Sequence, residues 1–165
     1  MKNLHLIICL WLALSVLHLS CKEEQPPVYA FIDQKLTGKI GTSNWAYQDG
    51  FAEVVSSGDE NNLRVELFLE QQEKGCGVFI PEGNSMFFYI PGKKGVYPLH
   101  FDMQGSNSLI VTLYEEDDPI GVNHHAGEGA VEIVSITETE VQGRVDAWAD
   151  GENYVNGNFV IAICD

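Results

Sequence analysis

Along most of this chain, apolar and polar residues alternate with a period of two. Such alternation places successive side chains on opposite faces of an extended backbone, so it predicts half-buried β-strands. Eight segments either show this alternation or are short runs typical of β-strands: Phe51–Val55, Leu63–Glu70, Met86–Ile90, Val96–Phe101, Ser108–Tyr114, Val131–Ile136, Val141–Trp148 and Val155–Ile163. After residue 27 no segment shows the period of an amphipathic helix.

Turn-forming sequences separate these segments. Asp49-Gly50, Pro91-Gly92 and Asp150-Gly151 are examples, each combining residues that favour tight turns. Short strands with frequent turns indicate an all-β fold, which we expect to be an antiparallel β-sandwich of about eight or nine strands. A β-barrel is the alternative.

A short pattern, apolar-polar-Gly-polar-apolar, occurs three times and places its glycine on the apolar face. It is found at Leu36–Ile40, Val141–Val145 and Val155–Phe159. Glycine inside a strand marks a bulge, a bend or the close approach of another group. We expect bends that let the sheet curl; a large ring such as Trp45 lying over a glycine, or a backbone-lined ligand slot, are the alternatives.

The N-terminus has the organisation of a secretory signal. A basic start at Lys2 precedes the uncharged run Leu4–Leu19, which ends at Ser20-Cys21. The run is shorter than the roughly 20 apolar residues of a membrane-spanning helix. We therefore expect residues 1–20 to be a removed signal peptide rather than a transmembrane anchor.

The segment Leu17–Cys21 resembles the lipobox of bacterial lipoproteins, with His18 where that family usually has an apolar residue. The resemblance implies cleavage before Cys21 and acylation of Cys21, so that the chain is bound to a membrane through its lipid. Lys22-Glu23-Glu24 resembles the export tag of Bacteroidota surface lipoproteins. This implies an envelope protein of the outer membrane, exposed at the cell surface; a charged, solvated tether is the alternative.

The resemblance also covers the C-terminal part of the chain. Gly129–Ile136, Val141–Ala147 and Asn156–Phe159 are similar to the terminal β-meander of uncharacterised all-β Bacteroidota envelope lipoproteins. That family implies a fold and a location but no catalytic residues.

Between the expected anchor and the β-rich part of the chain, Pro26 and Pro27 favour an extended spacer. We therefore expect a tether at residues 21–35 and a single all-β domain at residues 36–165.

Four cysteines are present. Cys9 belongs to the expected signal and Cys21 to the expected lipid anchor, which leaves Cys76 and Cys164. In an oxidising compartment such a pair is expected to form a disulfide, and two free buried thiols are the alternative.

Composition narrows the class of function. The formal net charge is −15, from 9 basic and 24 acidic residues. This charge argues against a nucleic-acid-binding protein and against electrostatic binding to an anionic bilayer. The chain has no serine-hydrolase elbow, phosphate-binding loop, zinc-protease motif or cofactor motif.

Three groups of residues could carry chemistry. His124 and His125, together with Glu128, could hold a metal only in a loop, because adjacent strand residues face opposite sides. Glu115–Asp118 offers oxygen ligands without a recognised calcium spacing, so we expect no metal site. Trp148 shares a polar strand face with Arg144 and Asp146. We expect Trp148 to pack within the protein, because large aromatic side chains are mostly buried. Stacking of Trp148 on a sugar, with Arg144 and Asp146 binding its hydroxyl groups, is the alternative.

We therefore predict a membrane-anchored envelope lipoprotein that acts as a non-enzymatic binding or structural module without a cofactor. Its partner would be the membrane, with a glycan or a protein as ligand. The alternatives are a carbohydrate-binding or adhesion module stabilised by calcium, and a small glycan hydrolase. A hydrolase would need two carboxylates at a defined separation, which only a structure can supply.

Overall fold

A computed structural model of the protein describes residues 28–57, 60–71, 76, 83–102, 108–116 and 120–164. The predicted signal peptide, Cys21 and the tag that follows it lie outside these residues. Within them, no helix is sufficiently long and apolar to cross a membrane. The strands are β1 (Thr37–Ile40), β2 (Ser43–Ala46), β3 (Asp49–Ser57), β4 (Glu60–Phe68), β5 (Ser85–Pro91), β6 (Gly95–Pro98), β7 (Val111–Glu115), β8 (Val122–Ala126), β9 (Glu128–Ile136), β10 (Glu140–Asp150) and β11 (Asn153–Cys164).

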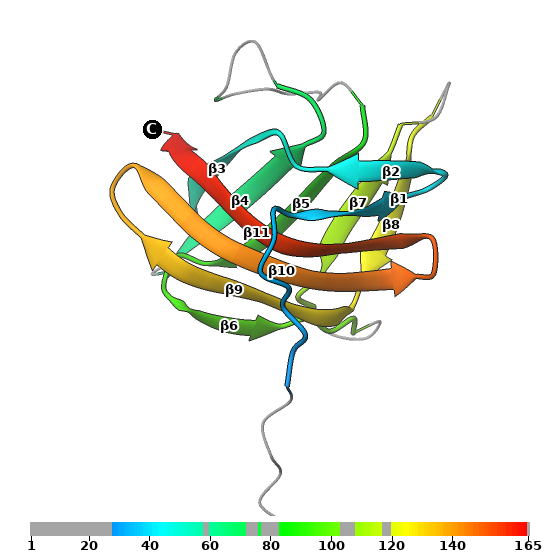
Figure 1. Ribbon diagram of the computed structural model, residues 1–165. Coiled ribbons are helices and arrows are strands. Elements are labelled where there is room, and N and C mark those ends of the chain that lie inside the picture. Colours follow the sequence, from blue (N-terminus) through cyan, green and yellow to red (C-terminus); the bar gives the residue numbers. More distant parts are fainter. Residues whose placement is uncertain are drawn as a thin grey trace, which may run out of the picture.

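All of these strands belong to one sheet, in the order β6-β9-β10-β11-β3-β4-β5-β7-β8, with the β1–β2 hairpin joined to β11 (Figure 1). The all-β prediction is confirmed. The sheet is mixed rather than wholly antiparallel, because β3 pairs with β11 in parallel. It also has more strands than expected: the short, polar strands β1, β2 and β8 lie outside the eight predicted segments, although β1 lies within the glycine pattern at Leu36–Ile40.

The sheet curls, so that its two halves face each other across a single main core. β8 lies against β10 and β11, although it is at the far end of the strand order. A bridge between His100 and Leu109 also connects the segment after β6 with the segment before β7. The enclosed core contains side chains from both halves, among them Leu63, Val65, Leu113, Val145, Val155 and Phe159. Burial of these side chains is the main source of stability in a fold of this kind.

The alternation predicted for the last two strands is confirmed. Val141, Val145 and Ala147 of β10 are buried in the core, whereas Trp148, between polar neighbours on the opposite face, is 44% exposed. On β11, Val155, Phe159 and Ile161 point inward. The outer face of these two strands therefore presents Arg144, Asp146, Trp148, Tyr154, Asn156 and Asn158.

The recurring glycines permit close approaches within the protein. A Cβ at Gly143 would lie 2.5 Å from the ring of Phe159, beside a register shift between β9 and β10. Gly157 has φ 138°, and a Cβ there would lie 2.7 Å from the backbone of Leu36. Thus the ring of Phe159 lies over Gly143. Gly38, the third glycine of the pattern, is opposite Trp45 in the β1–β2 register, and a Cβ there would meet the backbone of Tyr154 and Val155.

The residues that precede β1 lie along the outer face of the sheet. We call residues 28–34 the strap (blue in Figure 1). Gln34 O accepts a hydrogen bond from Asn158 N, and Leu36 N donates to Asn158 O, which aligns the chain with β11. Part of the segment that we expected to be a tether, residues 28–35, is therefore attached to the β-domain.

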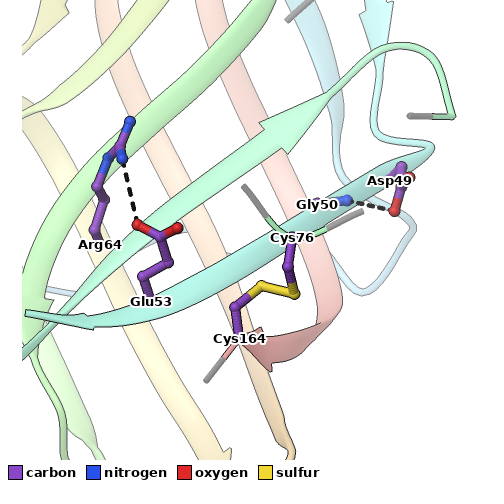
Figure 2. The surroundings of a disulfide bond; sticks show 6 residues. All are labelled: Asp49, Gly50, Glu53, Arg64, Cys76 and Cys164. Atoms are coloured by element: carbon purple, nitrogen blue, oxygen red, sulfur yellow. Dashed lines mark hydrogen bonds and ion pairs between the residues drawn. A yellow bond between two sulfur atoms is a disulfide. The ribbon is translucent and has the colours of Figure 1, made fainter. Parts of the chain in front are cut away.

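A disulfide closes the C-terminal end of β11. Cys76 and Cys164 are bonded, with their Cα atoms 5.6 Å apart (Figure 2), as the cysteine count predicted. Cys164 packs with Phe51 and Phe68 in a second, smaller apolar cluster. Phe51 and Phe68 lie on the face of β3 and β4 that points away from the main core, because their strand neighbours Ala52 and Leu67 point into it.

Removal of this disulfide should destabilise the fold. The bond closes a loop with a sequence separation of 88 residues, and disulfides of this kind contribute typically about 2–4 kcal/mol. We expect Cys76→Ser/Cys164→Ser to lower the free energy of unfolding by about that amount in urea titrations. Reduced wild-type protein should match the double variant; equal stability of oxidised and reduced wild type would contradict the prediction.

Candidate functional site

A groove of ≈ 450 Å³ lies on the outer face of the sheet, between the strap, the β1–β2 hairpin and the adjoining ends of β10 and β11. This volume is within the range of small-molecule sites in proteins. It is lined by Ile32, Gln34, Thr37, Gly38, Asn44, Trp45, Ala46, Leu69, Trp148, Tyr154 and Asn156. Of these described residues, none carries a charge, although the chain as a whole is strongly acidic.

An aromatic pair forms one side of the groove. Trp148 and Tyr154 are directly opposite each other in the β10–β11 register, just before the turn that joins the two strands. Their rings are stacked, with centroids 4.7 Å apart and planes 14° from parallel. Trp148 is 44% exposed, so one aromatic surface is open to solvent while Tyr154 supports the other.

The polar groups on the side chains that line the groove include amides and the hydroxyls of Thr37 and Tyr154. Gln34 Nε2 donates to Thr37 Oγ1 at 3.1 Å, and both residues line the groove. Asn44 on β2 adds a second amide. Asn156 on β11 also lines the groove, but its Nδ2 donates to Ala30 O and to Asp146, and its Oδ1 accepts from Ile32 N. An uncharged aromatic surface beside hydrogen-bonding amides suits a neutral ligand that has both an apolar face and hydroxyl groups.

Of the three residues that the sequence suggested for ligand binding, only Trp148 lines the groove. Asp146 is 7% exposed and accepts hydrogen bonds from Trp148 Nε1 at 3.1 Å and from the strap amide of Ala30 at 3.2 Å. Arg144 pairs with Glu132 and lies 4.9 Å from the ring centroid of Phe31 in the strap. Arg144 and Asp146 therefore hold the strap and orient Trp148.

The residues considered for metal binding make other contacts. His124 and His125 are consecutive in β8, and each has its own partner: His124 Nε2 lies 3.0 Å from Glu115, and His125 Nδ1 lies 3.3 Å from Thr112. Their strand positions direct them to opposite faces. Across the described part of the chain, no three His, Cys, Asp or Glu side chains are grouped as metal ligands. Asp117 and Asp118 lie outside that part.

A second groove, of ≈ 350 Å³, lies near the C-terminal end of β11. It is lined by Val54, Asn61, Leu63, Gly92, Ile136, Thr137, Glu138, Ile163 and Cys164. These described lining residues are a mixture of aliphatic and polar residues and include no aromatic ring. The groove beside Trp148 is therefore the better candidate for recognition.

Two carboxylates flank one arginine on the outer face of β3 and β4. Arg64 pairs with Glu53 at 3.4 Å (Figure 2) and with Glu66, which is 5% exposed. Burial raises the pKa of Glu66 above its ordinary value of 4.5; Arg64 lowers this pKa and Glu53 raises it, both to a smaller extent. Neither carboxylate lines the two grooves described above.

The raised pKa of Glu66 gives a testable pH dependence. The carboxyl group of Glu66 binds a proton more tightly in the folded protein than in the unfolded chain, so its protonation stabilises the fold at low pH. This stabilisation is lost as the pH rises from about 4.5 through the pKa of Glu66 in the folded protein. We expect Glu66→Gln, which resembles the protonated form, to become progressively more stable relative to wild type as pH rises from 4 to 7.

Urea titrations across this pH range measure the difference in unfolding free energy. Glu128→Gln, at an exposed position on β9, is the control and should show no comparable trend. A difference between Glu66→Gln and wild type that is constant from pH 4 to pH 7 would contradict the assignment.

No protein-family profile, curated protein or solved structure matches this chain. Sequence reasoning missed the amides of Gln34, Asn44 and Asn156 and the role of the strap. The one available signal was the outward position of Asn156 in the alternation of β11.

Proposed function

We propose that this chain is a lipid-anchored envelope protein whose β-domain is a non-enzymatic module that binds a neutral saccharide. The anchor is inferred from Cys21 and the signal before it, by the lipobox resemblance. An anchored domain of this kind acts by holding its ligand at a membrane surface.

One observation supports the saccharide: the uncharged groove beside the Trp148–Tyr154 stack. The apolar face of a pyranose ring can lie on the exposed indole, and its hydroxyl groups can exchange hydrogen bonds with the side-chain amides of Gln34 and Asn44. Because the described lining residues carry no charge, an anionic or cationic ligand would find no counter-ion there.

The glycan hydrolase is less well supported. It requires a carboxylic acid and a carboxylate facing the same substrate bond. The described lining of the Trp148 groove contains neither, and Asp146 beside it is occupied by three donors from the protein: Ala30 N, Trp148 Nε1 and Asn156 Nδ2. Binding without cleavage is the activity that this geometry favours.

Saccharide binding should depend on Trp148. We expect residues 21–165, with Cys21→Ser for solubility, to bind neutral oligosaccharides on a glycan array and by calorimetry. Trp148→Ala should weaken binding at least about tenfold, equivalent to about 1.4 kcal/mol, because the stacking surface is lost.

A matched control is Tyr89→Ala, which removes an aromatic side chain that is 50% exposed on β5 and does not line the groove. It should bind like wild type. The proposal fails if no neutral glycan binds, if Trp148→Ala binds normally, or if acidic glycans are preferred.

The lipid anchor should depend on Cys21. Expressed with labelled palmitate in a bacterium that processes lipoproteins, the full chain should incorporate label and fractionate with membranes. Cys21→Ala should do neither, because it lacks the thiol that is acylated. Cys164→Ala is a control that should still incorporate label; label in Cys21→Ala would refute the anchor.

A further inference from the structure

The buried carboxylate of Asp146 connects the strap to the aromatic side of the groove. It accepts hydrogen bonds from Ala30 N in the strap at 3.2 Å, from Trp148 Nε1 at 3.1 Å and from Asn156 Nδ2 at 2.9 Å. A carboxylate that is 7% exposed requires such donors, since an unpaired buried charge is strongly unfavourable. Loss of the strap would remove one of the three.

Asn156 binds the strap backbone from both sides of one residue. Its Nδ2 donates to Ala30 O at 3.0 Å, and its Oδ1 accepts from Ile32 N at 2.9 Å. The side-chain amide thus replaces a neighbouring strand for this part of the strap. Between these two bonds, the ring of Phe31 lies under the guanidinium of Arg144.

The strap also forms part of the groove. Ile32 and Gln34 line it together with Trp148, Tyr154 and Asn156. A ligand in the groove can contact Ile32 and Gln34 there only while the strap is bound to the sheet. These contacts therefore stabilise the ligand complex only when the strap is docked, so the ligand favours the docked state.

We propose that the strap is a ligand-stabilised part of the binding site and that its docking shortens the tether between the domain and the membrane. The ligand and membrane parts of this inference rest on the proposed function. By thermodynamic reciprocity, docking of the strap strengthens ligand binding by the same factor by which the ligand strengthens docking.

The strap lies between Cys21 and the sheet, so its docking changes the reach of the domain. A fully extended chain spans at most about 3.3–3.6 Å per residue. Release of residues 28–34 would therefore lengthen the tether by up to about 25 Å. A domain with an occupied groove is held closer to the membrane, and an empty one can extend farther from it.

The test uses Ala30→Pro in residues 21–165 with Cys21→Ser. Proline lacks the N–H that donates a hydrogen bond to Asp146. Residue 30 does not line the groove, so the substitution removes no ligand contact there. Val28→Pro is the matched control, since Val28 is 97% exposed at the end of the strap. Phe31→Ala is a second variant, which weakens docking by removing the ring beneath Arg144.

The first measurement needs no ligand. Residues 21–165 contain two of the three tryptophans of the chain, because Trp11 precedes Cys21. Trp45 is 1% exposed and Trp148 is 44% exposed, so acrylamide quenching of this protein reports mainly Trp148. We expect Ala30→Pro and Phe31→Ala to raise the quenching constant by up to about twofold, the increase that full exposure of Trp148 allows. Val28→Pro should resemble wild type. Near-ultraviolet circular dichroism identifies any variant that is unfolded.

The second measurement is amide hydrogen exchange. In wild type, the amides of Ala30 and Ile32 should be protected, and Ile32 should lose protection in Ala30→Pro. The neutral glycan that binds best on the array should slow exchange at Ile32 in wild type. The affinity of the protein for this glycan should be lower in Ala30→Pro than in wild type, because strap docking and glycan binding strengthen each other by the same factor.

The outcomes separate the two proposals. Solvent-like exchange at Ala30 and Ile32 in wild type would refute strap docking. Exchange that rises in folded Ala30→Pro and Phe31→Ala without a change in quenching would refute the connection to Trp148. If no neutral glycan binds, the proposed saccharide function fails, whereas the quenching result still decides whether the strap holds the aromatic side of the groove.

Discussion

Strand β11 constrains the whole structure, because it is hydrogen-bonded to three other strands. It pairs with β10 along most of its length, with β1 near its start and with β3, in parallel, at its end. Its inward residues Val155, Phe159 and Ile161 fill the core. Its outward residues Tyr154, Asn156 and Asn158 support the groove and the strap. One alternating strand thus builds both the interior and the candidate site.

The chemistry of the groove follows from how the charges beside it are used. Asp146 and Arg144 lie next to the groove, but their hydrogen-bonding groups are directed to Ala30, Trp148 and Glu132. Once these charges are satisfied within the protein, aromatic faces and neutral amides line the cavity. A strongly acidic chain can in this way present an uncharged binding surface, because buried or paired charges do not act on a ligand as free ones do.

The strap moves the boundary between the tether and the β-domain towards the N-terminus. Sequence composition favours an extended spacer up to residue 35, and nothing in its local pattern indicates a partner. The structure shows that the strap backbone is bound by Asn156, which is more than 120 positions away. Polar side chains that look solvent-exposed in an alternating strand can instead serve as hydrogen-bonding partners for a distant segment.

The local pattern of the chain determined the strand class, the faces of β10 and β11 and the outward position of Trp148, since a period of two acts on neighbouring residues. The number of cysteines outside the expected signal and anchor determined the Cys76–Cys164 pair. Only the tertiary structure decided that the strands form one curled mixed sheet, that Phe159 covers Gly143, and that Arg144 and Asp146 hold the strap rather than a ligand. Those outcomes depend on contacts between residues far apart in sequence, which no local periodicity specifies.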